Sequence, residues 1–152
     1  MGLNRCIGKE NQMPWHCASE LQHFQKLTMG HMLLMGKQTF LSIGKPLFGR
    51  TTLVLTHDNS FCYNDERVEV VHDLNAILKL YQHNEKQLMV CGGASLYQQT
   101  LSYADQIYLS VLRKSYKGDR FFPKIDSDEF TCVFQDVQQE FTCYHITRRK
   151  NH

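Results

Sequence analysis

Short apolar runs alternate with amphipathic segments along the chain, and this alternation predicts the order of its elements. Runs of three or four largely apolar residues are typical of strands that are buried on both faces of a sheet. Segments with apolar residues three and four positions apart predict helices between these strands. The predicted strands are 32–35, 53–55, 68–71 and 88–91, and the predicted helices are 20–28, 37–43, 74–81 and 94–101, with Ser19 and Asp73 as N-caps.

The last third of the chain shows strand patterns without an intervening helix. Segment 107–112 alternates between apolar and polar residues, and segments 130–134 and 141–146 predict an antiparallel pair. No repeat, low-complexity tract or linker divides the 152 residues. The pattern therefore predicts one α/β domain over residues 1–152, with three layers, a mostly parallel central sheet and antiparallel C-terminal strands.

A loop with helix-breaking residues precedes the first predicted helix. Gly8 and Pro14 keep this loop out of regular structure, and it carries Trp15, the single Trp of the chain. Glu20 falls in the first turn of the helix, on the same face as the apolar Phe24. A carboxylate in a first turn usually complements the helix dipole and faces water. On its own this pattern therefore indicates no function.

The composition argues against several classes of protein. With 17 Lys and Arg against 15 Asp and Glu, the net charge of +2 gives no reason to expect a nucleic acid or an acidic membrane as partner. The six Cys form no CxxC pair and follow no signal peptide, so we expect reduced thiols rather than a disulfide framework. The eight His show no metal-binding spacing, and no apolar run approaches about 20 residues. We therefore predict neither a metal site nor a membrane span.

Three predicted strand ends carry residues suited to a ligand with phosphates. Ligands of open α/β sheets gather at the carboxyl ends of the strands, where backbone N–H groups converge. The three places are 36–39, with a Gly, a cation and a hydroxyl, 55–57, with a hydroxyl and a His, and 92–95, with two Gly and a Ser. The chain has neither a GxGxxG nor a GxxxxGK[ST] motif. The residues alone therefore predict a nucleotide-like ligand and no particular reaction.

Three phrases of the sequence, taken together and in order, are similar to one known family. They are IGxxNxMPWHxxxELxxFxxxT over 7–28, MGKQTFLSIGKPL over 35–47 and GGASLY over 92–97. These phrases closely resemble the bacterial type of dihydrofolate reductase. The resemblance implies the NADPH-dependent reduction of 7,8-dihydrofolate to 5,6,7,8-tetrahydrofolate, by hydride transfer to C6 and protonation at N5. It also implies a cytoplasmic monomer with a place in one-carbon metabolism.

The resemblance assigns candidate roles to individual residues. Glu20 would orient the pterin and favour its protonation, Ser110 would supply a hydroxyl, and Trp15 would hold an ordered water. Arg50 would pair with the α-carboxylate of the glutamate tail, and the other substrate-binding positions are Leu21, Phe24, Ile43 and Leu47. The cofactor-binding positions are Ile7, Asn11, Met13, Gly36, Lys37, Gln38, Thr39, Leu55, Thr56, His57, Cys91, Gly92, Gly93, Ala94, Ser95, Leu96 and Tyr97, with Lys37 and His57 as cations near the 2′-phosphate and a cis peptide in the Gly92-Gly93 pair.

Several features depart from the family's pattern. Ala18 and Phe48 stand where the family frequently has Pro, Ser110 stands where it frequently has Thr, and the turn at 136–139 is shorter than in most relatives. The shorter turn leads us to expect a less stable terminal hairpin. Relatives also begin with a buried strand before the phrase that starts at Ile7. The chain as given starts without it, so we expect either a true start upstream of Met1 or a chain of low stability and weak activity, because two interior strands would each keep an unpaired edge.

Three functions remain open from the sequence. The first is an active, NADPH-dependent dihydrofolate reductase. The second is a non-catalytic or weakly active paralogue, truncated at the N-terminus, that binds NADPH or folate. The third is a pyrimidine reductase of riboflavin synthesis, which would have no reason to keep the phrase from Met13 to Glu20. The presence of Glu20, Trp15 and Arg50 together favours the first.

Overall fold

The computed structural model describes residues 1–10, 12–82, 84 and 86–150. The chain forms two compact units, which we call the first unit (Met1–Gln22 and Gln98–His152) and the second unit (His23–Tyr97). Helix α1 (Ala18–Thr28) begins in the first unit and ends in the second, whereas helix α4 (Ala94–Thr100) begins in the second and ends in the first. Each unit has its own hydrophobic core.

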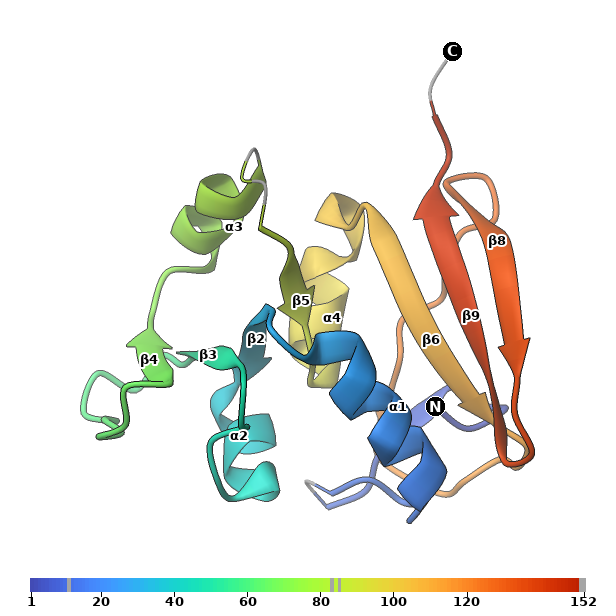
Figure 1. Cartoon of the computed structure of the whole chain (residues 1–152), viewed down its shortest axis with the longest axis horizontal. Coiled ribbons are helices and arrows are strands. Elements are labelled where there is room, and N and C mark those ends of the chain that lie inside the picture. The colour runs from blue at the N-terminus through green and yellow to red at the C-terminus, as the bar shows by residue number, and fades with distance from the viewer. Residues whose placement is uncertain (11, 83, 85, 151–152) are drawn as a thin grey trace. The chain divides into compact units, whose positions relative to one another are not determined.

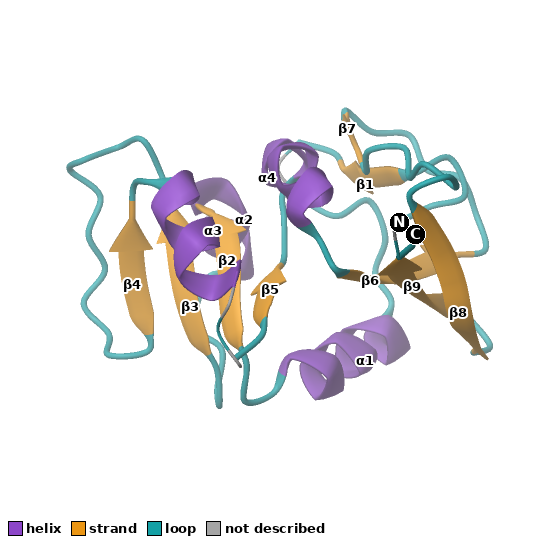
Figure 2. Cartoon of the chain, turned by 90° about the horizontal axis from the view of Figure 1, so that it is seen from above, coloured by secondary structure: helices purple, strands orange, loops and turns teal. Residues whose placement is uncertain are grey.

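The second unit is built on a parallel sheet of four strands. In Figures 1 and 2 the strands lie side by side in the order β4-β3-β2-β5, and all three neighbouring pairs are parallel. This arrangement confirms the predicted parallel sheet, and each predicted strand is present. The bounds are β2 Met32–Gly36, β3 Thr51–Leu55, β4 Val68–Val71 and β5 Leu88–Val90.

Helices cover both faces of this sheet. Phe40 of α2 (Lys37–Ile43) packs on Leu33 and Val54. On the opposite face, Leu34 packs with Leu96 of α4 and with residues of α3 (Leu74–Gln82). Successive residues of a strand point to opposite faces, so Leu33 and Leu34 enter different layers. Burial on both sides is the physical reason for the continuous apolar runs in the sequence.

Asp73 caps helix α3, as the sequence predicts. Its carboxylate accepts a hydrogen bond from the backbone N–H of Ala76, with Oδ1 at 3.1 Å from the nitrogen. We expect Asp73→Ala to lower the free energy of unfolding by about 1 kcal/mol, because one backbone donor of the first turn loses its partner. Urea denaturation measures this change. Asp73→Asn keeps an acceptor oxygen and is the control, and an equal loss in both variants would contradict the capping role.

The first unit contains an antiparallel sheet of three strands. These are β6 (Gln106–Leu112), β8 (Phe130–Val137) and β9 (Phe141–Arg148), in the order β6-β9-β8. The predicted antiparallel pair is confirmed, although β8 and β9 each extend beyond the predicted range. The short turn between them is held by Arg113, whose guanidinium donates to the carbonyl oxygens of Gln138, Gln139 and Phe141 and to Thr142 Oγ1. A tertiary contact thus supports the turn that the sequence marks as short.

Three features of the first unit differ from the sequence prediction or were missed by it. Strand β1 (Cys6–Gly8) pairs with the two-residue strand β7 (Arg120–Phe121), which the sequence presents only as a turn. A Cβ at Gly118 would collide with the carbonyl oxygen of Gly8, so the two segments approach closely only with Gly there. The predicted N-cap Ser19 was wrong, because α1 already begins at Ala18. The Ser19 hydroxyl instead donates to Glu140 Oε1 at 3.4 Å.

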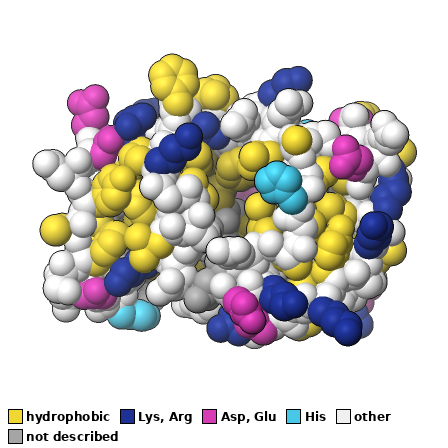
Figure 3. All heavy atoms as spheres, turned by 90° about the horizontal axis from the view of Figure 1, so that it is seen from below, with side chains coloured by type: hydrophobic (Ala, Val, Ile, Leu, Met, Phe, Trp, Pro, Cys, Tyr) yellow, Lys and Arg dark blue, Asp and Glu magenta, His cyan; other side chains and the backbone are white. Residues whose placement is uncertain are grey.

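The described part of the chain has no helix that is long and apolar enough to cross a membrane. Its six cysteines are free thiols, three of them buried. Among the described residues, no group of three or more His, Cys, Asp or Glu side chains is placed to hold a metal ion. Figure 3 shows, on the face that it draws, basic and acidic side chains interspersed with hydrophobic ones. The charges on that face form no continuous basic area.

Candidate functional site

Glu20 lies half-buried in the first turn of α1, in the first unit. Its negative charge raises the pKa of the Met1 amino group and that of the Cys143 thiol. The Met1 amino group donates to the carbonyl oxygen of Ser110 at 2.6 Å, and desolvation lowers its pKa to about 6, although the charge of Glu20 raises it. The sequence missed Met1 and Cys143 as neighbours of Glu20.

Ser110 and Cys143 face each other on neighbouring strands. They are paired across β6 and β9, and the Ser110 hydroxyl is hydrogen-bonded to the thiol. Burial raises the pKa of Cys143, and the nearby charges of Asp136 and Glu20 raise it further against the effect of the Ser110 hydrogen bond. The thiol is therefore neutral near pH 7. Glu20 therefore lies near the Ser110–Cys143 pair, and a half-buried carboxylate favours groups that donate hydrogen bonds to it.

Trp15 packs in the apolar core of the first unit. Its ring centroid lies 5.5 Å from that of Tyr116, and it packs against the buried cluster of Cys17, Leu112, Phe141 and Cys143. Among the described residues, the indole Nε1 is the buried side-chain nitrogen or oxygen that has no hydrogen-bond partner. A buried N–H without an acceptor costs about 1–3 kcal/mol. This donor therefore fits a water or a ligand atom as its partner.

Arg50 is buried in the second unit, with 6% of its surface exposed. An Arg directly before a strand is most often a surface charge, so only the structure shows this burial. Nη1 donates to Thr28 Oγ1 at 3.2 Å, and Nε donates to the carbonyl oxygen of Phe48 at 2.9 Å. Burial lowers the pKa of the guanidinium. Both partners are neutral, so the site fits an incoming carboxylate that would offset the cost of burying the charge.

The backbone of Gly92 and Gly93 closely approaches two neighbouring segments. The peptide between them is cis, as the resemblance implies. The N–H of Gly36 donates to the Gly92 carbonyl oxygen at 2.9 Å. A Cβ at Gly92 would lie 3.3 Å from the Tyr97 ring, and one at Gly93 would lie 3.4 Å from Thr39 Oγ1. Two of the predicted cofactor-binding segments, 36–39 and 91–97, therefore meet here, around backbone that carries no side chain.

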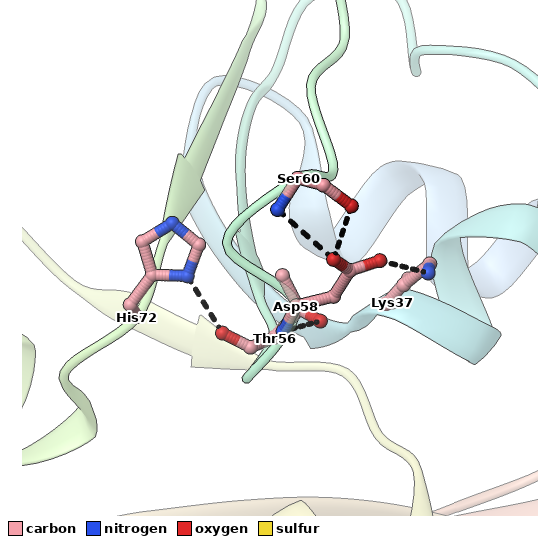
Figure 4. A network of polar contacts seen from close by, with 5 residues as sticks. All are labelled: Lys37, Thr56, Asp58, Ser60 and His72. Carbon is pink, nitrogen blue, oxygen red and sulfur yellow. Dashed lines mark hydrogen bonds and ion pairs between the residues drawn. The ribbon is translucent and has the colours of Figure 1, made fainter.

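A polar network lies at the carboxyl ends of β3 and β4 (Figure 4). We call Lys37, Thr56, Asp58, Ser60 and His72 the Lys37 cluster. Lys37 Nζ lies 3.0 Å from Asp58 Oδ2, and His72 Nδ1 lies 2.8 Å from the carbonyl oxygen of Thr56. The sequence missed Asp58, Ser60 and His72. Because Leu55 and Val71 are paired at the ends of their strands, the position after each strand end could have indicated His72 beside Thr56.

The other predicted site residues have different surroundings. Leu21, with 47% of its surface exposed, and Ile43 are not core residues, whereas Leu47 packs against the core of the second unit. Burial raises the pKa of Cys91 to about 12, so this thiol is neutral. Asn11 lies outside the described residues. Of the remaining positions, Met13, Gln38, His57 and Ser95 are exposed, Ile7, Phe24, Leu55, Ala94 and Tyr97 are half-buried, and Leu96 is buried.

The donor set of the second unit fits a phosphorylated nucleotide. Lys37 supplies a cation, and Thr39 and Thr56 supply hydroxyl groups near the strand ends. The backbone at Gly92 forms a cradle that a Cβ would fill. Charge, hydroxyl donors and an open backbone are the chemistry that phosphate groups require.

Comparisons with known proteins identify the family. The family model "Dihydrofolate reductase" matches residues 1–150. A dihydrofolate reductase of Staphylococcus aureus strain Mu50 is 44% identical, over 97% of this chain and 94% of the relative. That of Mycoplasma genitalium is 40% identical, over 95% and 91%. The solved structure of dihydrofolate reductase from Enterococcus faecalis complexed with NADP(H) and RAB-propyl superposes with a TM-score of 0.85 at 29% identity, over 98% of this chain and 92% of that one. The chain therefore belongs to the dihydrofolate reductase family.

Proposed function

We propose that this chain reduces 7,8-dihydrofolate to 5,6,7,8-tetrahydrofolate with NADPH, by hydride transfer to C6 and protonation at N5. Membership of the family makes the chain an NADPH-dependent oxidoreductase that acts on dihydrofolate. The observation that carries the assignment of individual roles is the half-buried carboxylate of Glu20 near the Ser110–Cys143 pair. When bound, NADPH supplies the hydride. The side chains supply binding, orientation and the control of a proton.

Glu20 is the residue that we assign to the pterin. A carboxylate can accept two parallel hydrogen bonds in one plane from a ligand, and the 2-amino and N3 groups of a pterin are such donors. With its charge on this edge of the ring, Glu20 orients the pterin and raises the proton affinity of N5. Ser110 adds a hydroxyl beside the neutral Cys143. The buried N–H of Trp15 supports its role in holding a water.

Arg50 is the residue that we assign to the glutamate tail of the substrate. Its buried guanidinium has neutral oxygen partners on Nη1 and Nε. An α-carboxylate would accept two parallel hydrogen bonds from the guanidinium, which gives orientation as well as charge. Thr28 and the backbone of Phe48 hold Arg50 in place for this contact. Leu47 and Phe24, both half-buried, are assigned to the apolar part of the substrate.

We assign three residues to the 2′-phosphate of the cofactor, namely Lys37, Thr56 and His57. We assign the Gly92-Gly93 backbone to close contact with the cofactor. The presence of His72 beside Thr56 adds a second imidazole to this group. Wild-type protein should therefore show a higher kcat/KM with NADPH than with NADH. Equal values for both cofactors would count against the assignment.

Lys37→Gln should lower the ratio of kcat/KM for NADPH to that for NADH at least about tenfold, because a charge-assisted contact to phosphate contributes about 1.5–3 kcal/mol. Steady-state kinetics with both cofactors measures the ratio. Lys45→Gln is the matched control, since Lys45 is an exposed lysine just beyond α2. An equal change in both variants would mean that Lys37 acts only through the general charge of the surface.

Several expectations from the sequence stay predictions. A single family model covers residues of both units, which supports one domain over residues 1–152. The monomeric state and the cytoplasmic location are also predictions. Size-exclusion chromatography with light scattering measures the first of these.

A further inference from the structure

The Lys37 cluster contains a carboxylate to which the proposed function gives no role. Asp58 lies in the loop after β3, and both of its oxygen atoms are engaged (Figure 4). Oδ2 accepts a hydrogen bond from Lys37 Nζ at 3.0 Å. Oδ1 accepts from the backbone nitrogen of Ser60 at 2.9 Å and from its hydroxyl at 2.6 Å. The backbone N–H of Asp58 also donates to Thr56 Oγ1 at 3.1 Å. The carboxylate is therefore held in one orientation toward Lys37.

Asp58 is negatively charged under all ordinary assay conditions. Hydrogen bonds from Ser60 and then from Lys37 lower the pKa of its carboxyl to about 2. The ammonium group of Lys37 also lies 5.0 Å from the centroid of the Phe61 ring. Lys37 is therefore fixed between an anion and an aromatic face, and its positive charge already has a partner.

A cation that already has a carboxylate partner attracts a phosphate less strongly. A phosphate monoester carries about −1.5 to −2 charges at neutral pH, so it repels a carboxylate held beside the same cation. A ribose 2′-hydroxyl is neutral and can donate a hydrogen bond to a carboxylate. In dinucleotide-binding sites, an acidic residue therefore favours the 2′-hydroxyl and a cation favours the 2′-phosphate. The Lys37 cluster holds one of each, 3.0 Å apart.

We propose that Asp58 is a specificity-determining residue, which by pairing with Lys37 lowers the preference of this chain for a 2′-phosphate over a 2′-hydroxyl. The proposal rests on the proposed function, in which Lys37 binds the 2′-phosphate. Lys37 sets the direction of the preference, and Asp58 limits its size. Ser60 contributes by holding the carboxylate in the orientation that keeps Lys37 paired.

Binding of two cofactor fragments to the full chain tests the proposal without turnover. Isothermal titration calorimetry measures the Kd of adenosine 2′,5′-bisphosphate and of adenosine 5′-monophosphate at fixed ionic strength. Asp58→Asn should tighten binding of the bisphosphate about 3- to 10-fold, as expected for removal of one like charge near the surface. Its affinity for the monophosphate should change less than about twofold by the same argument. Asp58→Ser removes the same charge with another polar side chain. It should therefore give the same result as Asp58→Asn for each of the two ligands.

Asp65→Asn is the matched control for this experiment. Asp65 lies in the same loop between β3 and β4 and pairs with Arg67 at 2.8 Å. Hydrogen bonds from Arg67 lower the pKa of its carboxyl to about 2, so the substitution removes an equal charge from a similar ion pair outside the Lys37 cluster. The bisphosphate should bind to Asp65→Asn as it does to the wild type. Circular dichroism of each variant verifies that it is folded.

Unchanged or weaker binding of the bisphosphate to both Asp58 variants would overturn the proposal, and so would an equal gain in Asp65→Asn. Lys37→Gln separates this failure from a failure of the proposed function. If Lys37→Gln weakens binding of the bisphosphate while the Asp58 variants do not change it, Lys37 keeps its assignment and Asp58 loses its own. If Lys37→Gln leaves that binding unchanged, Lys37 does not contact the 2′-phosphate and both assignments fail.

Discussion

Glu20→Gln should reduce kcat with dihydrofolate at least about 100-fold at neutral pH, because general acid–base groups contribute about 10²- to 10⁴-fold. The glutamine keeps the shape of the side chain and removes its charge. The pterin then loses the anion that orients it and raises the proton affinity of N5. NADPH affinity should change little, since the residues assigned to its phosphate groups belong to the second unit. Steady-state kinetics and fluorescence titration with NADPH measure the two effects separately.

The pH profile distinguishes this role from a merely structural one. As the pH falls, N5 of the substrate takes up its proton more readily from solvent, so the difference in kcat between wild type and variant should narrow. Glu140→Gln is the control, because Glu140 is an exposed carboxylate of the same unit that is bonded to Cys17 and Ser19 near the start of α1. Its kcat should stay close to that of the wild type. A Glu20→Gln variant with more than about half of the wild-type kcat would rule out the catalytic assignment.

Gly92→Ala should weaken NADPH binding at least about tenfold and lower the free energy of unfolding by about 1–3 kcal/mol. Gly92 has a φ of +103°, which a residue with a Cβ adopts only with strain. The added Cβ would also lie 3.3 Å from the Tyr97 ring and would enter the segment assigned to the cofactor. Urea denaturation measures the loss of stability, and fluorescence titration with NADPH measures the loss of affinity.

Gly30→Ala separates the effect of backbone strain from the effect of a Cβ that enters the segment assigned to the cofactor. Gly30 also has a positive φ, of +79°, but a Cβ there would meet no atom within 4 Å. We therefore expect Gly30→Ala to lose stability through backbone strain and to keep the wild-type affinity for NADPH. If both variants lose affinity equally, the effect of Gly92→Ala comes from stability alone, and the contact between Gly92 and the cofactor is disproved.

The sequence predicts the parts of the fold that depend on local pattern. Helix α2 was predicted with its observed bounds, and the carboxylate of Asp73 caps α3 as expected. Both are consequences of residues within one turn of the helix. The apolar runs likewise predict the parallel strands, because a strand that is buried on both faces needs apolar residues at nearly every position. Strands β1 and β7 were missed because two or three residues are too few to show a periodicity.

The features of the candidate site also separate into those set by local sequence and those set by contacts between distant segments. The sequence by itself determined which residue types stand at the strand ends and, through the three motif phrases, the family to which the chain belongs. It left the environment of those residues undetermined, since burial and pairing depend on segments that are distant along the chain. Only the tertiary structure decided that Arg50 is buried against Thr28 and that the Cys143 thiol lies beside Ser110. It also decided that Asp58, 21 residues from Lys37, holds the cation assigned to the cofactor, because the parallel pairing of β2 with β3 brings the ends of these strands together.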